Sequence, residues 1–278
     1  MPRTPLIAND TIAGPHGPIP VRRYSPVPDT PASAVPIVWI HGGAFVKGGL
    51  DQPESHSVAL ALARAGFPVI TVDYRLATGL RIPRPAPAVR YPIPFDDVVA
   101  VVEATQRDHP GGVILGGASA GACLAAAAVL RLAAAGKPAP LGTFFAYGTF
   151  HAALPTRSRQ LRARVTGPRR FTHTPSTISL MNLNYAGTRA ALRDPFAFPG
   201  GHPLGAFPPS LFIDADHDVL RASGSRFAEE VAATGIHTQY HLMHGTDHAF
   251  LNRPKDPGFG RAIDLIADWA RRVPATRT

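Results

Sequence analysis

The segment GVILGGASAGA, residues 112–122, constrains the fold of this chain more than any other. A short apolar run ends in small residues around a single hydroxyl, Ser119, and an alanine-rich, helix-forming stretch follows. This is the pattern G-x-S-x-G between a strand and a helix, where glycines permit a sharp turn that displays the serine. A serine at this place can instead simply cap the helix. The segment therefore predicts a strand, a tight turn and a helix, with Ser119 as nucleophile or as cap.

Strand-like and helix-like patterns alternate along the chain. Alternation of this kind predicts an α/β fold with a mostly parallel central sheet flanked by helices. Nearly continuous apolar strands agree, because parallel strands are covered on both faces. The expected strands are residues 19–24, 35–40, 67–75, 112–116, 142–148, 210–215 and 237–243, and the expected helices are 55–66, 94–109, 119–135, 223–235 and 257–273.

Two stretches interrupt the alternation. Residues 77–94 are rich in Pro and Arg and are expected to form a long surface loop. A weakly periodic insert begins at about residue 151, and inserts of this length often form lids. We expect one domain over residues 1–278, with a lid at approximately 151–205.

Charge and cysteine content narrow the function classes. The net charge of +9 raises a nucleic acid or an acidic ligand as a partner, but no basic-aromatic motif accompanies it, so we favour a solvated basic surface. Cys123 is the one cysteine and is expected in the core of a helix. The start MPRTPLIAND has no apolar signal region, and the longest apolar run, 122–130, is too short to span a bilayer. We expect a cytoplasmic protein without nucleic-acid or membrane partners. The sequence does not decide between a monomer and a homodimer.

A second glycine turn points to acyl-transfer chemistry. The apolar run 35–40 ends in His41-Gly42-Gly43-Ala44-Phe45. Closely spaced small residues let a substrate oxygen approach backbone N–H groups, as an oxyanion hole requires. The expected donors are the N–H groups of Gly42, Gly43 and Ala44, together with that of Ala120 after the serine. Without the serine motif, an ordinary glycine turn would be the better interpretation.

A nucleophilic serine needs a histidine base and a carboxylate that orients it. Three carboxylates, Asp214, Asp216 and Asp218, lie at the end of the expected strand 210–215, and His244 and His248 follow strand 237–243. Both groups stand where α/β sheets display their sites. The residues alone do not choose among these candidates.

Five motifs in order resemble the bacterial hormone-sensitive-lipase-like esterases. They are HGGAF (41–45), DYRLA (73–77), GASAG (117–121), DVLR (218–221) and HAF (248–250), and the resemblance covers about residues 15–273. It implies the α/β-hydrolase fold and a serine carboxylesterase that uses no metal or organic cofactor. It also selects Ser119 as nucleophile, Asp218 as the acid and His248 as the base.

The walls of the pocket are expected from apolar residues near the motifs. Phe45, Tyr185, Leu220 and Phe250 are expected as apolar walls, with core packing as the alternative, more so for Phe45 than for Tyr185. Ala44 replaces the family's third glycine, and the N-terminal cap is short or absent. A short N-terminus and no long apolar lid helix favour small-molecule esters with short acyl chains. An amidase or peptidase, or a non-hydrolytic ligand-binding relative, are the alternatives.

Arginines gather in the two irregular segments. A basic pocket mouth that captures anionic esters is one interpretation, and a solvated basic surface is the one we favour. The residues concerned are Arg157, Arg159, Arg162, Arg164, Arg169 and Arg170 in the lid and Arg81, Arg84 and Arg90 in the loop.

Overall fold

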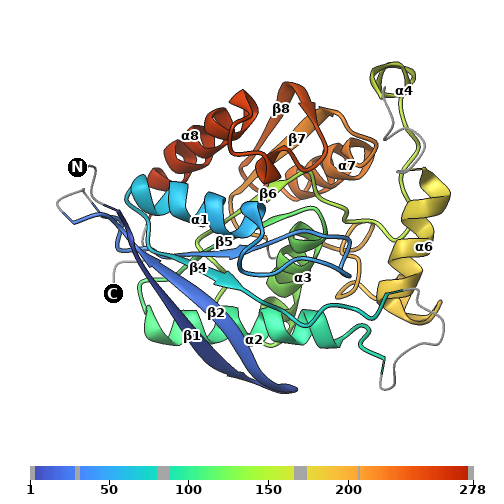
Figure 1. The fold of residues 1–278 in the computed structure, drawn as a ribbon. Coiled ribbons are helices and arrows are strands. Elements are labelled where there is room, and N and C mark those ends of the chain that lie inside the picture. Colours follow the sequence, from blue (N-terminus) through green and yellow to red (C-terminus); the bar gives the residue numbers. More distant parts are fainter. Residues whose placement is uncertain (1–3, 29–31, 80–87, 166–173, 206, 275–278) are drawn as a thin grey trace.

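The structure is a computed structural model that describes residues 4–28, 32–79, 88–165, 174–205 and 207–274. Within these ranges a single sheet of eight strands runs through the molecule in the order β1-β2-β4-β3-β5-β6-β7-β8 (Figure 1). The strands are β1 Leu6–Gly14, β2 Gly17–Ser25, β3 Ile37–Ile40, β4 Val69–Val72, β5 Ile114–Ala118, β6 Gly142–Ala146, β7 Ser210–His217 and β8 Thr238–Asp247. β2 is antiparallel to both β1 and β4, and the others pair in parallel.

Helices cover both faces of the sheet, and successive side chains along a strand point to opposite faces. In β3, Ile37 and Trp39 belong to the core under α1 and α8, whereas Val38 and Ile40 belong to the core under α2, α3 and α7. Figure 1 shows α1 and α8 on one side of the sheet and α2 and α3 on the other. These helices are α1 Pro53–Arg64, α2 Ile93–Asp108, α3 Ala120–Ala134, α7 Arg221–Ala232 and α8 Pro257–Arg271. The two-sided burial explains the nearly continuous apolar strands.

The strand order reverses beside β3. The chain places β4 on one side of β3 and then returns to place β5 on the other side. In parallel α/β sheets, this reversal opens a crevice at the carboxyl ends of the two strands. His41, directly after β3, and Ser119, directly after β5, therefore share one edge of the sheet.

The predicted α/β class with a mostly parallel sheet is confirmed, and each expected strand overlaps an observed one. The sequence analysis missed β1, which forms an antiparallel hairpin with β2. Residues 6–11 of β1 are all exposed, so the segment lacks the one-sided apolar pattern that marks a strand.

The insert after residue 151 contains α4 Arg159–Arg164, α6 Pro175–Ala186 and the short helix η1 Ala191–Arg193. Thr174 caps the start of α6, and Gly187 ends it with φ 75°. Asn182 anchors α6 by donating hydrogen bonds to the carbonyls of His151 and Ala152, at 3.2 and 3.0 Å. The sequence analysis missed α6 because its buried face mixes apolar side chains with asparagines. Arg81, Arg84, Arg169 and Arg170 lie outside the described residues.

Candidate active site

Ser119 occupies a strained turn between β5 and α3. Its backbone has φ 52° and ψ −116°, a conformation that non-glycine residues rarely adopt and that clusters at functional sites. The Ser119 N–H donates to the Ala146 carbonyl at 2.9 Å, which ties the turn to β6. The side chain accepts no capping hydrogen bond from α3, so the interpretation of Ser119 as a helix cap is wrong.

The side chains of Ser119, His248 and Asp218 form one hydrogen-bonded chain. Ser119 Oγ lies 3.1 Å from His248 Nε2, and His248 Nδ1 lies 2.6 Å from Asp218 Oδ2. The other Asp218 oxygen accepts from the Leu220 N–H at 2.9 Å, which fixes the carboxylate. All three side chains are buried, and they come from the carboxyl ends of β5, β8 and β7.

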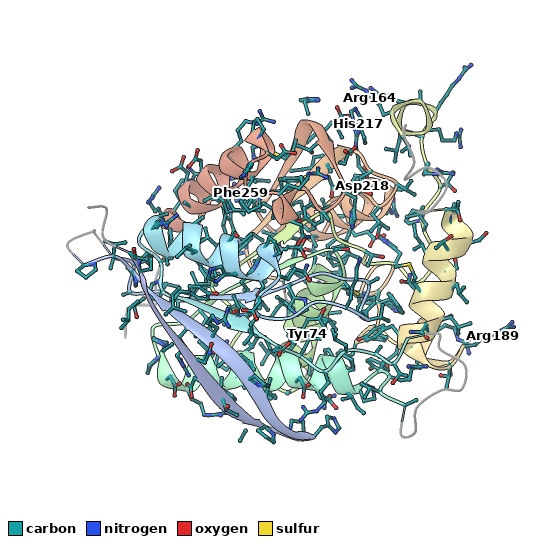
Figure 2. All side chains as sticks on the ribbon, viewed as in Figure 1. Tyr74, Arg164, Arg189, His217, Asp218 and Phe259 are labelled. Carbon is teal, nitrogen blue, oxygen red and sulfur yellow. The ribbon has the colours of Figure 1, made fainter. Side chains whose placement is uncertain are left out.

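The other candidate acids and the other histidine have different partners. Asp214 accepts from the Tyr240 hydroxyl at 3.0 Å. Asp216 accepts from Arg164 in α4 at 3.1 Å, and exposed His244 lies 3.6 Å from the same carboxylate. Figure 2 shows Arg164 and His217 gathered beside the end of β7, with Asp218 deeper in the molecule. The geometry thus separates residues that the sequence pattern left equivalent.

The loop after β3 turns through three consecutive residues with positive φ: Gly43 at 122°, Ala44 at 55° and Phe45 at 63°. The N–H groups of Gly43, Ala44 and Ala120 donate to no acceptor in the part of the chain that the structure describes. The Gly42 N–H instead donates to the buried Glu54 carboxylate at 2.6 Å. Gly42 was expected as an oxyanion donor, and this bond removes it from the set because its N–H is already engaged.

A cavity of about 800 Å³ opens above Ser119 and His248. Phe45 and Leu220 line it, as expected. Tyr185 and Phe250 do not: Tyr185 is fully buried with its ring stacked 3.9 Å behind Phe45, and Phe250 packs against Tyr147. The expected preference for Tyr185 over Phe45 is therefore wrong, because Tyr185 supports a wall that Phe45 forms.

Several lining residues were missed by the sequence analysis. Ile178 and Met181 come from α6 and form an apolar side, whereas Lys47, Asn252 and Arg253 bring polar groups from the loops after β3 and β8. No local motif marks these positions, since they reach the cavity only through the packing of α6 and of two separate loops.

The described arginines of the insert do not surround this cavity. Arg157, Arg159 and Arg162 are absent from its lining, and Arg164 pairs with Asp216. Arg90 lines a separate, smaller cavity beside α6, and Arg189 of the same cavity points outward in Figure 2. None of the described arginines of the insert and the loop lines this cavity, whereas Arg253, from the segment after β8, does.

Within the described ranges, no group of three or more His, Cys, Asp or Glu side chains is arranged to hold a metal ion. No helix in these ranges is long and apolar enough to cross a membrane.

Comparisons with known proteins show relatives of this chain. The family profile described as alpha/beta hydrolase fold matches residues 37–252. Esterase LipI of Mycobacterium tuberculosis is 29% identical over 266 residues, which cover 88% of this chain and 78% of that protein. Ethyl acetate hydrolase of Pseudomonas putida is 29% identical over 243 residues, covering 84% and 71%. The solved structure of a hyperthermophilic esterase from the archaeon Pyrobaculum calidifontis matches with a TM-score of 0.82 at 26% identity, covering 97% of this chain and 87% of that one.

Proposed function

Because this chain belongs to the alpha/beta hydrolase fold family, we propose that it hydrolyses carboxylic esters through an acyl-enzyme on Ser119. The resemblance to hormone-sensitive-lipase-like esterases and the carboxylic ester hydrolase class predicted from the sequence are confirmed by the family match and the esterases among its relatives. The observation that carries the residue assignment is the continuous chain from Ser119 Oγ through His248 to Asp218.

The proposed reaction begins with proton transfer from Ser119 Oγ to His248 Nε2 as Oγ bonds to the ester carbonyl carbon. Asp218 accepts the Nδ1–H hydrogen bond, so it holds the imidazole with Nε2 free as the base and stabilises the imidazolium. The imidazolium then gives its proton to the departing alkoxide, which leaves an acyl-enzyme and an alcohol. Water attacks the acyl carbon as His248 takes its proton, and the imidazolium then returns that proton to Ser119 Oγ as the acid is released.

The proposed oxyanion donors are the backbone N–H groups of Gly43, Ala44 and Ala120. Gly43 and Ala44 line the cavity, and Ala120 begins α3, so its N–H adds the positive end of the helix dipole. Removal of one such donor typically slows an acyl-transfer enzyme by about 10²- to 10³-fold. Positive φ at Gly43 and Ala44 turns this loop within two residues, which supports a tight anion-binding turn.

We propose short-chain esters of small alcohols as substrates. Phe45, Leu220 and, from α6, Ile178 and Met181 supply apolar side chains to the cavity lining. A relative from Pseudomonas putida is named for ethyl acetate, the ester of a two-carbon acid. The cytoplasmic location, the homodimer and the single domain with a lid over 151–205 remain predictions from the sequence.

The test of this function compares Ser119→Ala with the wild type on a chromogenic acetate ester, a butyrate ester and an anilide. We expect wild-type activity on both esters, little on the anilide, and loss of ester turnover by a factor on the order of 10⁶ in Ser119→Ala. Ser33→Ala, at the opposite edge of the sheet before β3, is the control and should keep full activity. Ester turnover that survives in Ser119→Ala would remove Ser119 as the nucleophile, and faster cleavage of the anilide would make the protein an amidase.

A further inference from the structure

Glu54 is a buried carboxylate beside the site that the reaction above does not use. It lies in the first turn of α1, is 1% exposed and contributes to the lining of the active-site cavity. No lysine, arginine or histidine nitrogen in the described ranges lies within salt-bridge distance of it. An unpaired buried carboxylate is costly unless hydrogen bonds satisfy it, so its partners indicate what it is for.

Four donors saturate the two Glu54 oxygens. Oε2 accepts from the Gly42 N–H at 2.6 Å and from Gln52 Nε2 at 3.3 Å. Oε1 accepts from the Tyr147 hydroxyl at 2.6 Å and from Asn252 Nδ2 at 3.0 Å. Gly42 belongs to the oxyanion loop, Tyr147 follows β6, and Asn252 stands four residues after His248. One carboxylate thus joins three segments that converge on the site.

The network requires a group that accepts on both sides. The Gly42 donor is a backbone N–H, which cannot reverse its role. The amide of Asn252 is oriented as well, because its Oδ1 accepts from the Glu54 N–H at 3.2 Å, so its NH₂ group must face Glu54 Oε1. An NH₂ group in place of either Glu54 oxygen would meet one of these fixed donors. The pKa of Glu54 is raised, because the effect of burial exceeds that of the hydrogen bonds from Tyr147 and the Gly42 N–H, which lower it. Each oxygen accepts from one donor of fixed direction, so the site requires an acceptor at both positions.

The connection to the chemistry runs in two directions. The bond to Gly42 holds its peptide away from the cavity, and the next two N–H groups in the loop are the proposed oxyanion donors. On the other side, the Tyr147 ring packs edge-on against the His248 ring, with centroids 5.1 Å apart.

We infer that Glu54 is a positioning residue for the proposed esterase reaction: by accepting hydrogen bonds on both oxygens, it keeps the oxyanion loop in register with the segment that carries His248. The inference rests on the proposed function. It assigns Glu54 no contact with the reacting atoms, so it acts through Gly42, Tyr147 and Asn252.

The deciding measurement is kcat and KM, determined separately, for Glu54→Gln on a chromogenic acetate ester. The amide keeps the shape but presents NH₂ to a fixed donor. We expect kcat to fall by about 10²-fold, comparable to loss of one oxyanion donor, with little change in KM.

Two further variants separate positioning from stability. Tyr147→Phe keeps the ring against His248 and removes one donor, so we expect a smaller loss of kcat, about tenfold, with little change in KM. This variant tests the inference if Glu54→Gln does not fold. Asp97→Asn is the matched control, since Asp97 is a fully buried carboxylate that accepts from the backbone and side chain of Arg75. It should lower the unfolding midpoint and leave kcat unchanged.

The outcomes distinguish this inference from the function beneath it. A wild type that hydrolyses no ester, or an active Ser119→Ala, overturns the proposed function itself. An active wild type and an inactive Ser119→Ala, with Glu54→Gln or Tyr147→Phe unchanged in kcat, overturn only the role of Glu54. A kcat that falls as far in Asp97→Asn as in Glu54→Gln also overturns it, because the loss would then follow from any lost buried carboxylate.

Discussion

Gly121→Ala should damage both the stability and the activity of this protein. Gly121 lies in the first turn of α3, where the helix packs against the end of β3. A Cβ atom at this position would lie 2.2 Å from the carbonyl oxygen of Ile40 and 2.4 Å from that of His41. Both neighbours are buried backbone atoms, which cannot rotate away as a side chain would, so α3 and β3 must move apart by most of an ångström.

The size of the effect follows from this clash. Overpacking of a buried site costs about 1–3 kcal/mol, and contacts with strand backbone place this substitution near the upper figure. For a domain of this size, about 3 kcal/mol corresponds to a midpoint lowered by roughly 6–12 °C. The same displacement moves Ser119 and the Ala120 N–H relative to the loop after His41, and a misplacement of about 1 Å can cost about 10²-fold in rate.

Thermal unfolding followed by circular dichroism and kcat on an acetate ester measure the two effects. Gly260→Ala is the matched control, because Gly260 is an exposed residue within α8 and an added Cβ meets nothing within 4 Å. It should raise the stability by up to about 1 kcal/mol through helix propensity and leave kcat unchanged. A Gly121→Ala protein as stable and as active as the wild type would refute the close contact between α3 and β3 on which this reasoning depends.

Three further predictions concern the triad, the substrate and pH. Asp218→Asn should lower kcat by about 10⁴-fold, whereas Asp216→Asn, which loses the partner of Arg164, should mainly destabilise the folded protein. Measured kcat values for the two variants check this. If Asp216→Asn is the inactive variant, the catalytic acid is Asp216 and not Asp218. Initial rates on esters of increasing acyl length should fall from butyrate to long chains, and equal rates on a long-chain emulsion would contradict the proposed cavity walls. Burial lowers the pKa of His41 from 6.5 to about 4, against the hydrogen bond to the Gly42 carbonyl. The unfolded chain therefore binds more protons in this window, and the free energy of unfolding should fall by about 3 kcal/mol as the pH drops from about 6.5 to about 4. His41→Asn should flatten that slope in urea titrations, and an unchanged slope would assign it to other groups.

Local patterns determined much of this protein from the sequence alone. The strand, the glycine-flanked serine and the following helix are encoded within residues 112–135, because the apolar period and the small residues act over a few positions. The same holds for the glycine turn after β3, whose resemblance to known esterases implied its use. The fold class could be predicted for the same reason, since the apolar period within each segment indicates a strand or a helix.

Packing between distant segments decided the rest. The hydrogen bond between Asn252 and Glu54 joins residues 198 positions apart, and no spacing along the chain predicts it. In that network the Gly42 N–H donates to Glu54, so it is not an oxyanion donor. In the same way, Phe45 rather than Tyr185 faces the cavity because one ring stacks upon the other, and α6 supplies walls although its own pattern is weak. A sequence specifies an element through its neighbours in the chain, whereas the direction of each polar group in the site depends on which remote element packs against it.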